Sequence, residues 1–344
     1  MSTMKWNRGG HILGRNRVAN GLLAGLGGCV LFSMAASGFA ADALIRFSTA
    51  APPSDFLAKS VDLFKSEVER ANVGLKVESH PASSLFKQGT EVPAMQRGTL
   101  EMSSMTTFEV AQQIPAFGFV NRAFAFRDYA HLQAVFNGPI GEEYRRAVDE
   151  KMGIHILATA YLGTRQVALR QKRKVATPAD LAGVKLRMPA GPEWLLLGQT
   201  LGVSPIPMGM PEVYLALKTG TIDGQENPLS IFSAAKLYEV SEQVVLTSHM
   251  VQPVFFNIAS KFYDHLNDAQ KKTLQAAAEV AVKANDSGRL ADEKSITEAL
   301  RGRGLEVSAI DLAPFHALAD KVYAQADATA AWDKALAQRV KDTK

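Results

Sequence analysis

The sequence predicts an α/β protein made of two lobes, and three observations support this fold class. Strand-like and helix-like segments alternate along most of the chain, which is typical of mostly parallel sheets covered by helices. A leader of 40 residues leaves 304 of the 344 residues, enough for two domains of ordinary size. No flexible linker divides these residues, so we expect several chain crossings between the lobes and a hinged cleft where a ligand binds.

The first 40 residues have the pattern of a secretory signal peptide. They contain four Lys or Arg and no acid, and an uncharged run extends from Val18 to Ala41. Gly38 and Ala40 are the small residues that a signal peptidase requires, so we expect cleavage after Ala40, with Ala43 as the alternative. A membrane anchor and a lipid anchor at Cys29 are the competing interpretations. The signal interpretation predicts a periplasmic protein.

The net charge of +4 belongs to this leader. Without its four cations, 34 basic and 34 acidic residues remain. Nucleic acids and polyanionic membranes select proteins with a large positive field, so neither is expected as a partner. The only cysteine, Cys29, also lies in the leader. We therefore expect neither disulfides nor thiol chemistry in the mature chain.

The elements of the first half follow from apolar spacing. Apolar residues three and four positions apart predict helices. Alternating apolar and polar residues, or short apolar runs, predict strands. The expected strands are 44–47, 75–78, 100–105 and 154–158. The expected helices are 57–68, 91–97 and 131–152.

The second half continues the same alternation. Capping and turn residues mark the helix starts, such as Thr177 followed by Pro178. The expected strands are 166–170, 184–188 and 305–307. The expected helices are 211–219, which Gly220 follows, and 267–301, with further helical segments within 313–340. The helix at 267–301 is long enough to brace both lobes. We expect residues 41–162 and 253–290 to form lobe I and residues 163–252 and 291–344 to form lobe II.

Arg187 is the first candidate for ligand binding. It lies at the carboxyl end of the strand 184–188, which Pro189 terminates, and open α/β sheets bind ligands at such ends. Its guanidinium matches a carboxylate with two parallel hydrogen bonds. The structural alternative is a solvated arginine whose stem covers apolar surface.

Three further candidates have equally ordinary alternatives. Arg165 follows Gly163, a glycine that would let the backbone approach a ligand, but it also suits an ion pair between strands. Asn227 is fixed in extended geometry by Pro228 and either contacts a ligand or serves a turn. Met210 forms either an apolar wall of the site or part of the core.

Four ordered motifs resemble a known family. They are GVKLRMP at 183–189, LGVSPIPM at 201–208, EVYLALKTG at 212–220 and DGQENP at 223–228. Together they resemble the DctP-type extracytoplasmic solute-binding proteins of TRAP (tripartite ATP-independent periplasmic) transporters. The resemblance covers essentially the whole mature chain and is strongest at 161–246. It implies a periplasmic-binding-protein-like fold, with two lobes joined by crossing strands and a long helix.

The resemblance also implies a function and a site. Family members bind mostly organic acids and deliver them to a TRAP permease. It implies that Arg187 holds the carboxylate of the ligand, that Arg165 is a second cationic contact, that Asn227 is an amide contact and that Met210 covers the ligand.

Weaker correspondences concern the rest of the pocket. Trp194 follows the arginine strand and is expected either to floor the pocket or to open the next helix. Gln88 and Glu91 match a region that tunes selectivity. Relatives of the sialic-acid type carry a charged residue at about Thr106, where this chain reads Ser104-Met105-Thr106-Thr107, so a sugar acid of that type is disfavoured.

Two other functions compete with this interpretation. One is a binding protein for another transporter or sensor class. The other is a secreted serine hydrolase, because Ser84-x-x-Lys87 and the Lys-Thr-Gly at 218–220 match two motifs of penicillin-recognising enzymes, although the third is absent. We expect no enzyme, no cofactor, no metal and a monomer. The identity of the acid stays open among C4-dicarboxylates, 2-oxo or 2-hydroxy acids and aromatic acids.

Overall fold

A mixed sheet of nine strands organises the structure, a computed structural model that describes residues 42–344. The expected signal peptide and Cys29 lie outside these residues. Eight strands follow the order β2-β1-β3-β8-β4-β7-β5-β6, and β9 pairs with β8. The strands are β1 (Ala43–Ser48), β2 (Leu75–His80), β3 (Met102–Met105), β4 (Ile154–Leu169), β5 (Lys185–Met188), β6 (Ser204–Pro207), β7 (Gly224–Pro228), β8 (Gln243–Ala259) and β9 (Glu306–Ala309).

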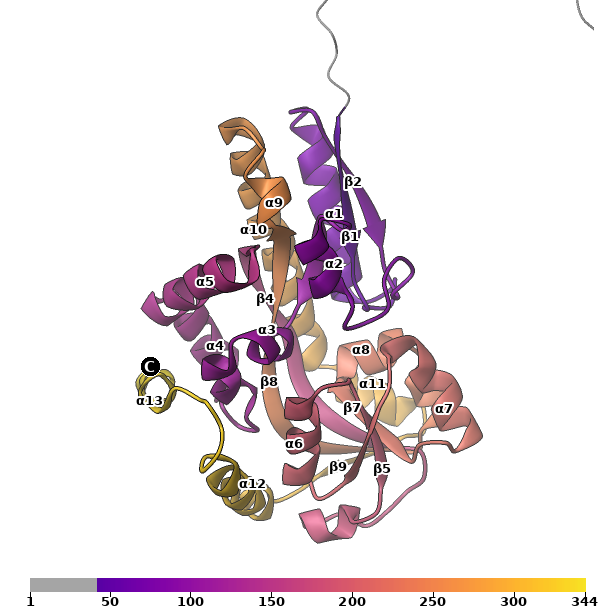
Figure 1. Cartoon of the computed structure of the whole chain (residues 1–344). Helices are drawn as coiled ribbons and strands as arrows, with labels where there is room; N and C mark the ends of the chain where they lie inside the picture. Colours follow the sequence, from indigo (N-terminus) through magenta and orange to yellow (C-terminus); the bar gives the residue numbers. More distant parts are fainter. Residues whose placement is uncertain (1–41) are drawn as a thin grey trace, which may run out of the picture. The chain divides into compact units, whose positions relative to one another are not determined.

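Helices surround this sheet (Figure 1). Those of the first half are α1 (Phe56–Arg70), α2 (Glu91–Arg97), α3 (Thr107–Gln113), α4 (Tyr129–Phe136) and α5 (Pro139–Met152). Those of the second half are α6 (Pro192–Thr200), α7 (Val213–Thr219), α8 (Leu229–Ala234), α9 (Ser260–Tyr263), α10 (Asp268–Glu293), α11 (Ile296–Gly302), α12 (Ala313–Ala326) and α13 (Lys334–Asp342). The expected helix at 131–152 is divided between α4 and α5, and the one at 267–301 between α10 and α11.

Two long antiparallel strands, β4 and β8, join the two halves of the sheet. The β1–β2–β3 group attaches to β8 near Phe255, and the β5–β6–β7 group attaches to β4 near Arg165. Within each group the strands are parallel, as the alternation predicts. The expected strands 154–158 and 166–170 are one continuous strand, and β8 was not expected at all. The pairing of β4 with β8 shifts register at three places, which keeps both strands continuous while they bend.

Helix α10 replaces a neighbouring strand along the free edge of β4. The first half of β4 pairs only with β8, so its outward backbone groups need other partners. Asp286 accepts a hydrogen bond from the Tyr161 N–H at 2.8 Å, and Asn285 donates one to the Tyr161 carbonyl at 2.8 Å. Glu293 accepts one from the Thr164 N–H at 3.0 Å. These side chains fix the long helix against the crossing strand.

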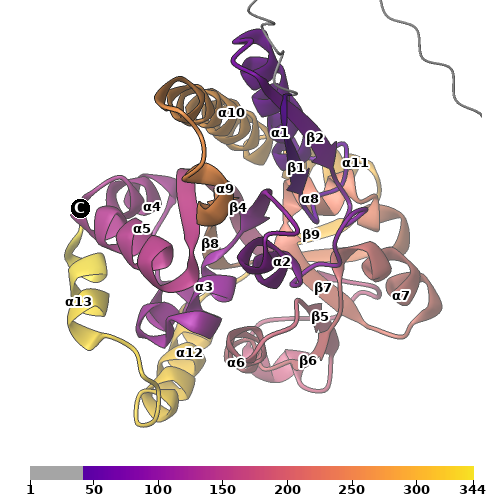
Figure 2. The ribbon, with the colours of Figure 1, turned by 45° about the horizontal axis from the view of Figure 1, so that its top comes forward.

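The buried apolar residues form three clusters. The first joins α1, β1 and α10 with α7 and α8, the second surrounds α4 and α5, and the third lies around β5 and α6. Leu336 and Val340 of α13 belong to the second cluster, together with Phe117 and Tyr144. Figure 2 shows α13 beside α4 and α5. This packing associates 334–342 with the residues expected in lobe I, although the sequence placed them in lobe II. No helix within 42–344 has the length and apolar character to span a membrane.

Candidate functional site

A cavity of about 90 Å³ opens where the two strand groups face each other. Thr49 and Thr106 follow β1 and β3 on one side, and Pro189 follows β5 on the other. The carboxyl ends of parallel strands are where open α/β sheets bind ligands, so the topology alone selects this position. The cavity is lined by all six residues proposed from the sequence: Gln88, Arg165, Arg187, Trp194, Met210 and Asn227. Their contact with a ligand stays a prediction.

Arg187 is a buried cation with uncharged partners. Its side chain is 1% exposed, so the solvated alternative does not apply. Its Nε donates to the Met208 carbonyl at 2.8 Å, and its Nη2 donates to Oε1 of Gln88 at 3.3 Å. Its Nη1 lies 3.9 Å from the sulfur of Met210. Burial lowers the pKa of Arg187 to about 10, which leaves it charged at neutral pH. An anion entering the cavity would compensate this charge.

Arg165 is already paired. Its Nε and Nη2 form a two-pronged ion pair with Glu226 on the neighbouring strand β7, with Nη2 2.7 Å from Oε1. Nη1 donates to Oε1 of Gln252 at 2.7 Å, and Nη2 also reaches Oδ1 of Asn227 at 3.1 Å. The ion pair between strands is therefore present, and the residue also lines the cavity.

Glu226 is held as a carboxylate by two groups. Burial raises its pKa, but Arg165 and His249 outweigh burial and lower it below its ordinary value. Nε2 of His249 lies 3.2 Å from Glu226, and Nδ1 lies 2.8 Å from Oγ1 of Thr247. Burial lowers the pKa of His249, which favours the neutral ring. The positive charge of Arg165 is thus balanced within the protein.

Gly163 has a different role from the expected one. It lies inside β4 at a register shift, with φ +124°, and a Cβ there would come within 2.6 Å of the Pro228 Cβ. The close approach that requires glycine is to Pro228 of β7, the residue that follows Asn227. The Asn227 Nδ2 donates to Oε1 of Gln225 at 2.6 Å.

Aromatic and amide contacts connect the two sides of the cavity. Trp194, at the start of α6, stacks on Phe108 of α3 with ring centres 3.7 Å apart and planes 9° apart. The Arg165 guanidinium lies 4.9 Å from the Trp194 ring centre. Trp194 therefore both opens α6 and forms a wall of the cavity. Gln88 Oε1 accepts from the Met210 N–H at 2.8 Å, which joins the loop before α2 to the opposite side.

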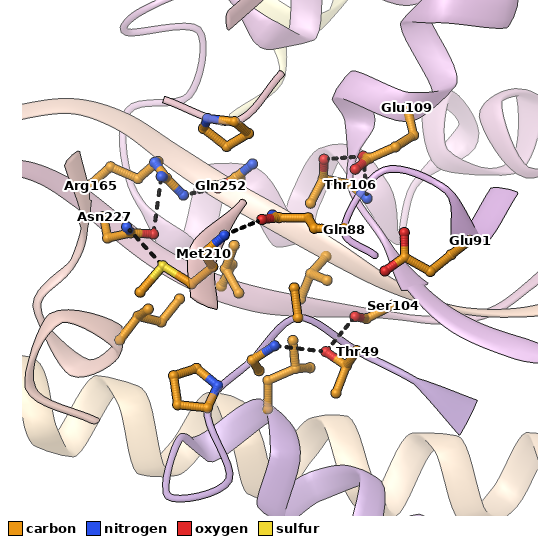
Figure 3. A pocket seen from close by; sticks show the side chains of 18 of the residues that line it. Thr49, Gln88, Glu91, Ser104, Thr106, Glu109, Arg165, Met210, Asn227 and Gln252 are labelled. Carbon is orange, nitrogen blue, oxygen red and sulfur yellow. Dashed lines mark hydrogen bonds between the residues drawn. The ribbon is translucent and has the colours of Figure 1, made fainter. Parts of the chain in front are cut away.

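The wall opposite Arg165 and Asn227 is acidic and hydroxyl-rich (Figure 3). Glu91 and Glu109 both line the cavity, together with Thr49 and Ser104, whose side-chain oxygens are 2.7 Å apart. Glu109 is engaged at the start of α3, where it accepts a hydrogen bond from the N–H of Thr106 at 2.9 Å. Burial raises the pKa of both carboxyls, that of Glu91 to about 7.

Gln252 and Glu226 are site residues that sequence reasoning missed. Gln252 is 1% exposed in β8, lines the cavity, and has no hydrogen-bond partner at Nε2 within the described residues. Glu226 lies one residue before Asn227, inside a motif that the sequence singled out. The sequence did not predict that Glu226 pairs with Arg165, because this pairing depends on β7 lying beside β4.

The hydrolase motifs lack the required arrangement. The Lys-Thr-Gly at 218–220 ends helix α7, with Gly220 as its left-handed cap, whereas the enzymes carry this motif on a strand. Ser84 is exposed in the loop between β2 and α2. Within 42–344, no group of three His, Cys, Asp or Glu side chains has the geometry of a metal site.

Comparison with known proteins gives consistent results. Residues 47–329 match the family model DctP, described as bacterial extracellular solute-binding protein, family 7. A solute-binding protein of Verminephrobacter eiseniae is 33% identical over 288 residues, covering 83% of this chain and 85% of that protein. The 2,3-diketo-L-gulonate-binding periplasmic protein YiaO of Escherichia coli is 30% identical over 239 residues, covering 70% and 72%.

Solved structures show the same relationship. A TRAP periplasmic solute-binding protein of Roseobacter denitrificans, bound to 3-deoxy-D-manno-oct-2-ulosonic acid, has a TM-score of 0.84 and 34% identity, covering 88% of this chain and 99% of that chain. One from Polaromonas, bound to D-erythronate, has a TM-score of 0.81 and 27% identity, with the same coverage. The fold is therefore the periplasmic-binding-protein-like fold that the sequence predicts. The chain belongs to the DctP family of bacterial extracellular solute-binding proteins, the family that serves TRAP transporters.

Proposed function

We propose that the protein captures a small organic acid in the cavity between the two strand groups, with Arg187 as the anchor for the carboxylate. The observation that carries this proposal is the state of Arg187: a buried guanidinium with uncharged partners, facing a cavity. A carboxylate there forms charge-assisted hydrogen bonds in a site from which water is largely excluded. Asn227 and Gln252, which are neutral, and Arg165, whose charge Glu226 balances, then hold the same end of the ligand.

The ligand class that fits best is a hydroxylated acid. The related structures hold 3-deoxy-D-manno-oct-2-ulosonic acid and D-erythronate, both of which combine a carboxylate with several hydroxyl groups. The lining of this cavity offers matching groups, with Arg165 on one side and the oxygen-rich side chains of Thr49, Ser104 and Glu91 on the other. This favours hydroxy acids over aromatic acids and over acids without hydroxyl groups.

Delivery to a TRAP permease follows from family membership. The proposed lobes are 41–162 with 253–290, and 163–252 with 291–333, with α13 assigned to the first lobe because of its packing. They meet at β4, β8 and α10, and closure around the acid would create the surface that the permease recognises. We propose a periplasmic monomer without enzymatic activity, exported by the leader at 1–40.

The test is ligand binding by the protein that lacks residues 1–40. A thermal-shift screen with hydroxy acids, dicarboxylates, amino acids and neutral sugars comes first. Ligand at 100 times its dissociation constant stabilises a fold by about 2.7 kcal/mol. Titration calorimetry on Arg187→Ala should then show at least a 100-fold loss of affinity, while Arg173→Ala, an exposed arginine outside the cavity, keeps it. Stabilisation by neutral sugars alone, or unchanged affinity in Arg187→Ala, would refute the proposal.

A further inference from the structure

The cavity has a charged end that the arginines do not explain. Glu91 begins α2 and is 8% exposed. Its Oε2 accepts a hydrogen bond from the Gly89 N–H at 2.7 Å. Within the described residues its Oε1 has no hydrogen-bond partner, and the side chain lines the cavity. A carboxylate oxygen of a largely buried side chain that lines the ligand space and bonds no protein donor is suited to receive a donor from the ligand.

The charges around the cavity also limit what it can hold. Arg165, Arg187, Glu91 and Glu109 are the charged residues that line it within residues 42–344. Glu226, which does not line the cavity, neutralises Arg165 through the two-pronged ion pair. Arg187 is therefore the cation that a ligand can pair with. The cavity can therefore balance one negative charge of a ligand, through Arg187. Its acidic wall would repel a second one.

The two acidic residues of that wall differ in how far protein hydrogen bonds already occupy their carboxylate oxygens. Glu109 is tied to Thr106 at the start of α3 by both the N–H and the hydroxyl of that residue. Within residues 42–344, Glu91 is held only by the backbone of its own loop, through the Gly89 N–H. Figure 3 shows Arg165 and Asn227 on one side of the pocket and Glu91 and Glu109 on the opposite side. A ligand whose carboxylate reaches the side of Arg165 and Asn227 thus presents its far end to Glu91.

We propose that Glu91 is a specificity-determining residue, which accepts a hydrogen bond from a hydroxyl at the far end of the ligand and rejects acids that carry a second carboxylate there. The inference rests on the proposed acid-binding function. A far hydroxyl donates to the free oxygen, whereas a far carboxylate places like charges together in a site of low dielectric, a strong basis for discrimination. Dicarboxylates are thus excluded by repulsion as well as by the lack of a second free cation.

The test compares acids that differ only at the far end. D-gluconate and D-glucarate share six carbons and differ by a hydroxymethyl group or a carboxylate, and D-erythronate and meso-tartrate form the corresponding four-carbon pair. Affinities are measured by titration calorimetry at pH 8 on the protein lacking residues 1–40. We expect at least one monoacid to bind at least tenfold more tightly than its diacid. Glu91→Gln, which keeps the acceptor for Gly89, should reduce that ratio at least tenfold.

Control variants separate this inference from the proposed function. Glu150→Gln removes an exposed carboxylate far from the cavity lining and should leave the ratio unchanged. Arg187→Ala should weaken both members of a pair. A ratio that Glu91→Gln does not alter, or a wild-type preference for the diacid, would overturn the role of Glu91 while acid binding stands. Failure of all four acids to bind the wild-type protein would refute the proposed hydroxy-acid function and this inference with it.

Discussion

At the scale of single residues, the two arginines of the cavity differ in what balances their charge. Arg165 has a carboxylate partner in the protein, and Arg187 has a carbonyl, an amide oxygen and a thioether. A buried cation without a counter-ion is destabilising unless a ligand supplies one. The unequal pairing therefore supports the proposed anchoring role of Arg187 and a positioning role for Arg165.

Replacing Arg187 by lysine tests whether the shape of the guanidinium matters as well as its charge. An ammonium cannot bond the Met208 carbonyl through Nε and also present two parallel N–H groups to a carboxylate. Each such hydrogen bond is worth about 1.5 to 3 kcal/mol. We expect Arg187→Lys to weaken acid binding by at least tenfold in calorimetry, with unchanged circular dichroism. Wild-type affinity would mean that charge alone anchors the ligand.

The ionisation of Glu91 predicts a pH dependence of stability. Burial raises its pKa to about 7 in the folded protein, above the ordinary value of 4.5. A raised pKa means that the folded state binds the proton more tightly. The resulting stabilisation is fully present below about pH 4.5 and is lost as the pH rises through 7.

The Glu91→Gln side chain cannot ionise, so the variant should not lose stability as the pH rises. Between pH 5 and pH 8 the variant should gain up to about 3 kcal/mol in the free energy of unfolding relative to the wild type. Urea unfolding of the ligand-free proteins at both pH values measures the difference, with Glu150→Gln as the control. Identical pH profiles for wild type and Glu91→Gln would show that Glu91 ionises normally.

Sequence reasoning identified some site residues and missed others for physical reasons. Arg187 could be identified from the sequence because strand alternation and Pro189 place it at the end of a strand. Glu226 and Gln252 act through neighbours on other strands, and a single sequence does not reveal strand register. The pairing of Arg165 was foreseen only as an alternative, since its partner lies 61 residues away.

At the scale of elements, the crossing strands were the hardest part to predict. Gly163 interrupts the pattern of β4, and glycine usually weakens a strand. Pro253 does the same in β8, because a central strand rarely tolerates a residue without an N–H. In the structure the two interruptions meet, since Tyr161 pairs with Pro253 and Gly163 with Gln252 across a register shift. Pro253 therefore lies beside a register shift of β4, and the close approach of Pro228 on β7 requires the glycine at position 163.

Gly163→Ala tests this close packing. A Cβ would lie 2.6 Å from the Cβ of Pro228, at φ +124°, where side chains are strained. We expect a loss of about 2 to 4 kcal/mol in the free energy of unfolding. Gly302→Ala, at the end of α11 with no atom within 4 Å, is the matched control and should change stability little. Denaturant unfolding of both variants checks the prediction, and equal stabilities would show that β7 shifts freely at this point.

At the scale of the whole molecule, the family fold was predictable because the ordered motifs and the strand–helix alternation agree. The placement of α13 was not predictable, because the sequence of a short amphipathic helix after a loop does not say which apolar surface it packs against. Its burial of Leu336 and Val340 beside Phe117 and Tyr144 ties the end of the chain to the first half. The chain therefore passes between the proposed lobes once more than the sequence indicates, at the segment between α12 and α13.

Closure around the ligand is the prediction at this scale. In the structure Gln88 bonds Met210 and Arg187 across the cavity, and Phe108 stacks on Trp194, so the two walls are in contact. These few contacts carry little of the free energy needed to hold lobes together, whereas a carboxylate on Arg187 adds charge-assisted bonds within the closed site. We expect small-angle scattering to show a smaller radius of gyration with a saturating acid than without it. Arg187→Ala should show no decrease with the same acid. Equal radii for the wild-type protein in both conditions would mean that it is closed before the acid binds, and that the acid must then enter through a local opening of the Gln88 loop.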